Sequence, residues 1–124
     1  MIYGIGTDIV EVERLKKWIN NSSMIDRYFN QEEQKSFSNE QGACEHYAAR
    51  FAAKEAFGKA LGTGLAGFSL KDVYIKNNEN GKPELIVKGS AAELIKKQCG
   101  EVKIHVSLSH ESAYAIAYII IEKI

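Results

Sequence analysis

RFAAKEAFGKALGTG, at residues 50–64, is the stretch that decides the fold, because it predicts most of a long helix. We expect the helical run to begin near Gly42 and to end at Gly62 and Gly64, since glycine commonly follows the last turn of a helix. Small side chains recur along this helix, at Ala48, Ala52, Ala53, Ala56 and Ala60. They predict that a second element packs closely against it.

Shorter elements around this helix indicate an α+β fold, with a mainly antiparallel sheet, one long helix and several shorter ones, in a single domain over residues 1–124. Gly4 and Gly6 lie in an apolar strand, where glycine indicates that something approaches the backbone closely. Asn30 and Glu33 have the spacing of a capping box at the start of a short helix. The other expected elements are a strand from Ile2 to Ile9, a helix over about Val10 to Ile19, a hairpin of residues 73–76 and 84–88, a helix over residues 90–98 capped by Ser90 and Glu93, and strands over residues 103–109 and 114–121.

Composition excludes several classes of protein. The 124 residues contain 16 basic and 16 acidic side chains, so the net charge gives no reason to expect binding to nucleic acid or to an anionic membrane. The longest apolar stretch, residues 113–121, is much shorter than the roughly 20 residues that span a bilayer. The start has no signal-peptide pattern, so we expect a cytoplasmic protein in which Cys44 and Cys99 are reduced and structural.

Local charge is more informative than net charge. Residues 14–27 are mainly basic, whereas residues 31–45 are mainly acidic. Two interpretations are open. Either the two segments neutralise each other across a pair of helices, or the basic segment docks an acidic partner.

Asp8 and Glu55 are the candidate metal ligands, because Mg²⁺ prefers oxygen donors and is commonly held by one or two carboxylates plus substrate phosphates. Lys59 lies one helical turn beyond Glu55 and can place its ammonium on the same phosphates. Ordinary alternatives exist: Glu55 and Lys59 also fit a surface ion pair, and Asp8 with Glu11 fits a capping box. Lys54 is interpreted either as a solvated lysine or as a phosphate contact.

Three longer motifs occur in the order GIGTDIVEVER at residues 4–14, RFAAKEAFGKALGTG at residues 50–64 and HVSLSHESAYAIA at residues 105–117. Together they resemble the 4′-phosphopantetheinyl transferases, and among these the short bacterial holo-acyl-carrier-protein synthases. The middle motif is the most specific, with F-x-x-K-E-x-x-x-K in a helix that ends at a glycine pair. The resemblance covers nearly the whole chain.

The resemblance implies transfer of the phosphopantetheine arm of coenzyme A to a serine of an apo acyl carrier protein, releasing adenosine 3′,5′-bisphosphate, as a step of fatty acid biosynthesis. Asp8 and Glu55 would hold Mg²⁺, and Lys59 would contact the phosphates or the leaving group. Ser109 and His110 would bind the nucleotide of coenzyme A at its 3′-phosphate.

The attacking hydroxyl belongs to the carrier protein, so this chain needs no nucleophile of its own. Glu55 is the first candidate for the base, directly or through a metal-bound water, although a carboxylate bound to Mg²⁺ is a weak base. The larger monomeric members of the family carry a second acid where this chain has Val10. Water would fill that coordination position, with Glu11 as an alternative ligand.

The monomeric members are about twice as long as this chain, which implies that the short form is a homotrimer with its sites between subunits. One subunit would provide the two acids and Lys59, and its neighbour would provide Ser109 and His110. Residues 114–121 carry apolar side chains on both faces, which is typical of a strand that is buried on two sides, either in a contact between subunits or equally in the core of a monomer.

Carrier proteins of this type are acidic, so Arg14, Lys17 and Trp18 are the candidate docking residues on the first helix. Two other functions compete with this interpretation. A non-catalytic subunit that binds coenzyme A or a nucleotide would keep phosphate contacts but would tolerate the loss of an acid. A pure interaction module would leave the three ordered motifs unexplained.

Overall fold

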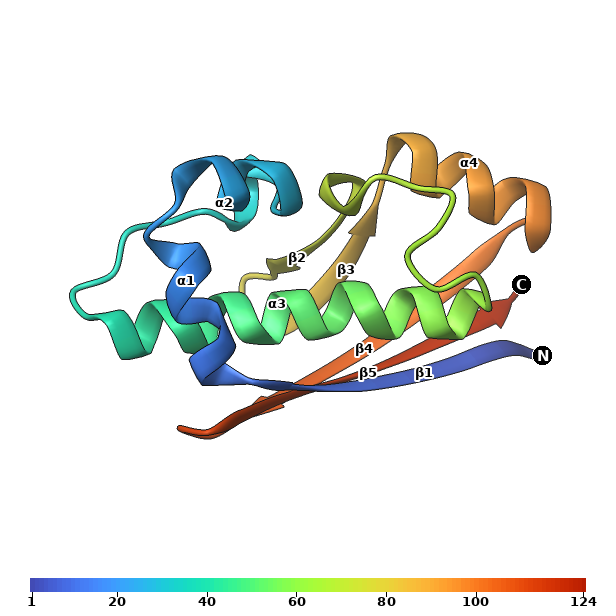
Figure 1. Cartoon of the computed structure of the whole chain (residues 1–124). Helices are drawn as coiled ribbons and strands as arrows, with labels where there is room; N and C mark the ends of the chain where they lie inside the picture. The colour runs from blue at the N-terminus through green and yellow to red at the C-terminus, as the bar shows by residue number, and fades with distance from the viewer.

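The structure is a computed structural model that describes all residues, 1–124. Its base is a three-stranded antiparallel sheet with the strand order β1 (Ile2–Glu11), β5 (Tyr114–Lys123) and β4 (Val102–His110). The long helix α3 (Glu40–Leu61) lies along one face of this sheet and packs on β1 and β5 (Figure 1). The α+β class and the antiparallel sheet are as expected from the sequence.

The remaining elements surround α3. A two-stranded antiparallel hairpin, β2 and β3, contacts α3 and the β4 edge of the sheet, and the first short helices lie over the N-terminal half of α3 (Figure 1). With η denoting a 3-10 helix, these elements are η1 (Val12–Leu15), α1 (Lys16–Ile19), α2 (Ser22–Tyr28), η2 (Gln31–Glu33), η3 (Leu70–Asp72), β2 (Val73–Asn77), β3 (Pro83–Val87) and α4 (Gly89–Gln98).

The contact between β1 and α3 is a contact between backbones. A Cβ atom added to Gly4 would lie 1.9 Å from the carbonyl oxygen of Ala60, and one added to Gly6 would lie 1.9 Å from that of Ala56. Non-bonded carbon atoms pack at about 3.5–4.0 Å, so neither position has room for a side chain. The close approach predicted from these glycines is therefore confirmed, and the alanines of α3 make it possible.

Both ends of α3 have capping interactions. The side chain of Asn39 accepts a hydrogen bond from the backbone N–H of Gly42 at 2.7 Å, so the helix begins at Glu40, slightly before the expected start. Gly62 follows the last turn with φ at 90°, the left-handed conformation that glycine adopts without strain. The predicted capping box is also present, although the short helix that it opens, η2, is a 3-10 helix.

Two predicted helix starts are wrong. β1 continues to Glu11, where a helix was expected from Val10, because this segment still pairs with β5. Ser90 and Glu93 do not cap α4. Instead, the carboxylate of Asp72 accepts hydrogen bonds from the backbone N–H of Ser90 at 2.8 Å and from its hydroxyl at 2.6 Å.

The main core lies between α3 and the sheet. The buried side chains of β5 all come from alternate positions, and they are Ala115, Ala117, Ile119 and Ile121. The opposite side, which we call the outer face of the sheet, is not covered by this chain. Ile5 and Ile9 are 58% exposed there, and Tyr118 is 52% exposed. One chain therefore buries only one side of β5, and the two-sided burial expected for residues 114–121 does not occur within it.

The structure also bears on the membrane and cysteine predictions. None of its helices combines the length and the apolar character needed to cross a membrane. Cys44 and Cys99 are buried and form no disulfide. Burial raises the pKa of the Cys44 thiol, which keeps it protonated and unreactive, in keeping with a structural role.

Candidate active site

Asp8, Glu55 and Lys59 meet where β1 crosses α3. The glycine contacts run β1 antiparallel along the helix, and alternate residues of a strand share a face, so Asp8 lies beyond Gly6 on the side that faces α3. The ammonium of Lys59 donates hydrogen bonds to Oδ1 of Asp8 at 3.1 Å and to the carbonyl oxygen of Thr7 at 3.0 Å. The residues predicted from two distant motifs are thus brought together by the fold.

The two carboxylates repel each other. Partial burial, and then the charge of Asp8, raise the pKa of Glu55, while Lys59 and Arg14 act in the opposite direction. The pKa of Glu55 stays raised although Lys59 and Arg14 are near, so a divalent cation would still interact favourably with the two carboxylates. Carboxylate oxygens are the ligands that Mg²⁺ prefers, so the residues present fit this metal.

The protein offers only these two acidic ligands. No group of three or more His, Cys, Asp and Glu side chains gathers anywhere in the chain in a way that could hold a metal. Val10, at the position of the second acid in the larger family members, is buried in the core. Glu11 lies three strand positions from Asp8 and so points to the other side of β1, away from Asp8 in this chain. The capping box of Asp8 and Glu11 is absent, because Asp8 lies within β1 and no side chain caps η1. The remaining ligands would be waters and substrate phosphates.

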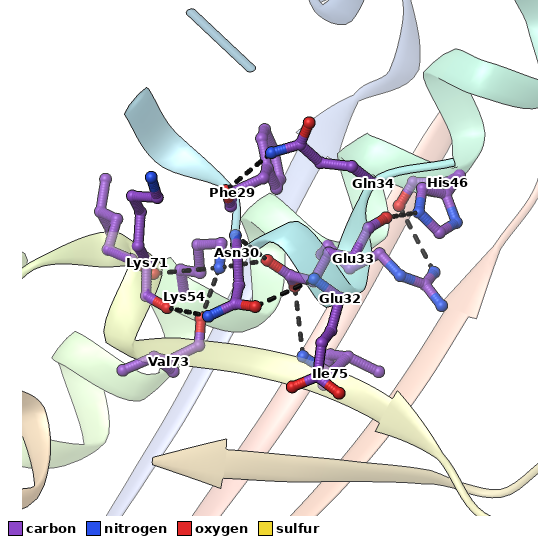
Figure 2. A network of polar contacts seen from close by, with 12 residues as sticks. Phe29, Asn30, Glu32, Glu33, Gln34, His46, Lys54, Lys71, Val73 and Ile75 are labelled. Atoms are coloured by element: carbon purple, nitrogen blue, oxygen red, sulfur yellow. Dashed lines mark hydrogen bonds and ion pairs between the residues drawn. The ribbon is translucent and has the colours of Figure 1, made fainter. Parts of the chain in front are cut away.

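Lys54 is neither solvated nor available to a phosphate, so both interpretations of this residue are wrong. Its side chain is completely buried, and its ammonium donates to Oε1 of Glu33 at 2.7 Å, to the carbonyl of Leu70 at 3.0 Å and to the carbonyl of Val73 (Figure 2). All three donors of the ammonium are therefore used. Sequence reasoning missed this network because its members are distant along the chain.

Ser109 and His110 lie at the end of β4, away from the two acids. Ser109 is exposed on the outer face of the sheet, the side opposite Asp8. His110 points toward α3, where its Nδ1 atom is 3.6 Å from a carboxylate oxygen of Glu45. Glu45 precedes Glu55 by ten residues, which is about 15 Å along a helix. One chain does not unite the two parts of the predicted site.

The candidate docking residues lie together. Arg14, Lys17 and Trp18 line one surface cleft beside β1, and Arg14 and Lys17 are exposed. Trp18 is half-buried, with its ring stacked on Tyr28 at 5.2 Å between centroids and edge-on to Phe51 at 5.0 Å. Trp18 is therefore held in place by the protein itself, and only part of its ring is free to contact a partner.

The basic and acidic segments do not neutralise each other. No ion pair joins residues 14–27 to residues 31–45. The acids of the second segment have other partners: Glu32 accepts a hydrogen bond from the hydroxyl of Tyr74 at 2.7 Å, and Glu33 pairs with Lys54. Of the two interpretations of the charge pattern, docking of an acidic partner is the one that the structure leaves open.

Comparison with known proteins identifies the family. The model of the 4′-phosphopantetheinyl transferase superfamily matches residues 4–119. A holo-[acyl-carrier-protein] synthase from Treponema denticola is 51% identical over 123 residues, which cover 98% of this chain and 99% of that protein. Another, from Geotalea daltonii, is 44% identical over 126 residues, covering 99% of this chain and all of the relative.

Solved structures agree in fold over the full length. The holo-[acyl-carrier-protein] synthase of Neisseria meningitidis superposes with a TM-score of 0.87 at 35% identity, covering 99% of this chain and 100% of that one. That of Bacillus anthracis, in complex with CoA (3′,5′-ADP), gives a TM-score of 0.79 at 33% identity and covers 100% of this chain and 99% of that one. The chain therefore belongs to the 4′-phosphopantetheinyl transferase superfamily, among the holo-[acyl-carrier-protein] synthases.

Proposed function

We propose that this enzyme uses Mg²⁺ to transfer the 4′-phosphopantetheine arm from coenzyme A to a serine of apo acyl carrier protein, and that it releases adenosine 3′,5′-bisphosphate. The convergence of Asp8, Glu55 and Lys59 carries the proposal, because it sets two mutually repelling carboxylates beside an ammonium. The relative from Bacillus anthracis, solved in complex with CoA (3′,5′-ADP), supports the choice of donor and product.

In this reaction the serine oxygen forms a bond to the phosphorus next to the pantetheine arm, and the bond from that phosphorus to the bridging oxygen of the pyrophosphate breaks. Mg²⁺ held by Asp8 and Glu55 would neutralise charge on the phosphate oxygens. The side chain of Lys59 is 53% exposed, so its ammonium can reach a departing phosphate while it stays near Asp8. Electrostatic stabilisation of this kind is the main contribution that a protein makes to phosphoryl transfer.

The hydroxyl proton of the carrier serine must also be removed. Glu55 is the side chain to which we assign this step, because it lies in the site beside Asp8 and Lys59. A carboxylate that binds Mg²⁺ is itself a weak base, so we assign the proton transfer to Glu55 acting through one water. The carrier protein supplies the nucleophile, so no serine of this chain is assigned a catalytic role.

A transfer assay tests the proposed reaction. The protein is incubated with coenzyme A, Mg²⁺ and an apo carrier protein, and the carrier is weighed by mass spectrometry. We expect the carrier to gain the mass of one phosphopantetheine arm. This gain should disappear when a chelator removes the metal, and it should also be absent with either Asp8→Asn or Glu55→Gln. A chain that binds coenzyme A but modifies no carrier would instead be the non-catalytic subunit considered above.

We further propose that the active unit is a homotrimer whose sites lie between subunits. Apolar side chains on the outer face, including Ile5, Ile9 and Tyr118, are exposed in one chain and would be buried by neighbouring copies. Ser109 and His110 lie away from the acids of their own chain, so these nucleotide contacts would have to come from a neighbour.

Subunit mixing tests the shared site. Glu55→Gln and His110→Ala should each be inactive alone, because each loses one half of every site. When the two variants are refolded together, some interfaces combine an intact Glu55 with an intact His110, and part of the transfer activity should return. Mixed trimers that stay inactive would show that both residues act within one chain.

Docking of the carrier protein is assigned to the cleft that Arg14, Lys17 and Trp18 line. Neither Arg14 nor Lys17 forms an ion pair within this chain, although Glu11 and Glu13 also line the cleft. Arg14 lies near enough to Glu55 to act on its pKa, so a carrier bound in the cleft would lie beside the site. An acidic carrier is the complementary partner, and the exposed part of Trp18 can serve as its apolar contact.

A further inference from the structure

The buried ion pair of Lys54 and Glu33 has no part in the function proposed above. It ties three segments together (Figure 2). Oε1 of Glu33 accepts from Lys54 and from the backbone N–H of Asn30 at 3.1 Å, and Oε2 accepts from the backbone N–H of Ile75 at 3.2 Å. Lys54 belongs to α3, Asn30 and Glu33 to η2 with its cap, and Ile75 to β2.

Stability alone is a poor reason for this arrangement. Two charges that are removed from water lose hydration, and replacing a buried ion pair by apolar side chains of similar volume is often neutral or stabilising. Both side chains here are 0% exposed. Hydrogen bonds differ from apolar contacts in having direction. The ammonium of Lys54 reaches the carbonyls of Leu70 and Val73 as well as Glu33, and this combination specifies one orientation of the helix.

Glu55 directly follows Lys54 along α3. Successive residues leave a helix about 100° apart, so Lys54 points toward η2 and β2 while Glu55 points toward the side where Asp8 lies. The backbone of β1 holds α3 at Ala56 and Ala60. The helix is therefore held from two directions within two turns. If α3 rotated about its own axis by about 20°, each Cα atom, which lies about 2.3 Å from that axis, would move by about 0.8 Å.

We propose that Lys54 is a positioning residue, whose buried contacts with Glu33 and with the carbonyls of Leu70 and Val73 fix the rotation of α3 and thereby aim the Glu55 carboxylate at Asp8. The inference rests on the proposed role of Glu55 as a metal ligand. Lys54 itself touches neither metal nor substrate.

Two variants separate positioning from stability. Lys54→Met leaves Glu33 buried without its partner, so it should lower the melting temperature, weaken Mg²⁺ binding about tenfold and reduce kcat about 10- to 100-fold. The double variant Glu33→Leu with Lys54→Met replaces the whole pair by apolar side chains. Its melting temperature should exceed that of Lys54→Met, because no unpaired charge is buried, but it should stay below that of the wild type, because the backbone N–H of Ile75 and the carbonyl of Val73 lose their partners. Mg²⁺ binding and kcat should stay low, because the directional contacts are still missing.

Three measurements are needed: thermal unfolding, calorimetric titration of Mg²⁺ into the protein saturated with coenzyme A, and transfer kinetics. The KM for the carrier protein should change little, since its docking surface is untouched. Ile95→Ala, a buried position on α4 outside the network, is the control for general destabilisation and should keep wild-type kcat at temperatures where it is folded. If the double variant does not fold, Lys54→Met is compared with this control well below both melting temperatures.

The outcomes distinguish this inference from the function on which it rests. A double variant that regains Mg²⁺ binding and kcat together with its melting temperature would show that the pair only stabilises the fold, and so would a Lys54→Met protein that matches Ile95→Ala. A wild-type protein that binds no Mg²⁺ in the presence of coenzyme A would instead overturn the assignment of Glu55 as a ligand.

Discussion

Replacing Gly6 by alanine would test whether the backbone contact between β1 and α3 builds the site. The added Cβ would lie 1.9 Å from the carbonyl oxygen of Ala56 and 2.7 Å from the backbone nitrogen of Ala60. Both obstacles are backbone atoms, which cannot turn aside as a side chain can. Ordinary contact begins at 3.4 Å, so strand and helix would have to separate by about 1.5 Å at this point.

Asp8 is two residues along the same strand, so it would move with β1 relative to Glu55. Displacement of a catalytic group by about 1 Å can cost on the order of 100-fold in rate. Overpacking of this kind also destabilises by about 1–3 kcal/mol. We therefore expect Gly6→Ala to fold with reduced stability and to transfer the phosphopantetheine arm about 100-fold more slowly than the wild type.

A matched variant controls for the loss of stability. Gly100 has φ at 78° and no atom within 4 Å of an added Cβ, so Gly100→Ala strains the backbone by about 1–2 kcal/mol without pushing on α3. Transfer is followed by the mass of the carrier protein below both melting temperatures. If Gly6→Ala works as fast as Gly100→Ala, the backbone contact does not set the geometry of the site.

Further predictions concern charge and assembly. In the absence of metal at pH 7, Glu55→Gln should have a higher melting temperature than the wild type. The raised pKa of Glu55 means that the charged carboxylate is less favourable in the folded protein than in the unfolded chain. A lower melting temperature in calorimetry would contradict this. Burial, and then the charge of Arg50, lower the pKa of His46 from 6.5 to about 4. As the pH falls from 6.5 to 4, His46 is therefore protonated in the unfolded chain before it is protonated in the folded protein, and the free energy of unfolding decreases by up to about 3 kcal/mol. In urea unfolding experiments, His46→Gln should not show this part of the decrease. Arg14→Glu should weaken binding of the carrier roughly tenfold and binding of coenzyme A less, whereas equal losses in surface plasmon resonance would remove Arg14 from the docking surface. Tyr118→Lys should dissociate the proposed trimer, which sedimentation experiments would detect. A variant that stays trimeric would show that the outer face is not the interface.

The parts of the fold that follow local rules could be predicted from the sequence. The glycine that ends α3, the capping box of η2 and the hairpin all depend on residues close together in the chain. A close contact of the strand with another element could also be predicted, since glycines in the strand and alanines in the helix both allow backbones to approach each other. Which residues meet was not foreseeable from spacing alone, and the pairing of Asp8 with Glu55 came from the family motifs.

The errors share a physical cause. The sequence predicts an accessible Lys54, because lysine is rarely buried and its partner Glu33 lies 21 residues away. It also predicts that Ser90 caps α4, whereas Asp72 accepts the hydrogen bond. In both cases a tertiary contact replaces a local one, and a pattern search along the chain detects only the local kind.

The side-chain alternation of β1 links assembly to catalysis. Gly6 and Asp8 face α3, while Ile5 and Ile9 face outward. A shift of the strand by one residue would put Asp8 on the outer face and an isoleucine against the helix backbone, where no side chain fits. The proposed metal site and the apolar outer face are therefore set by one register. Changes that shift β1 should impair metal binding and oligomerisation together, whereas Glu55→Gln on α3 should remove transfer and leave the proposed trimer intact.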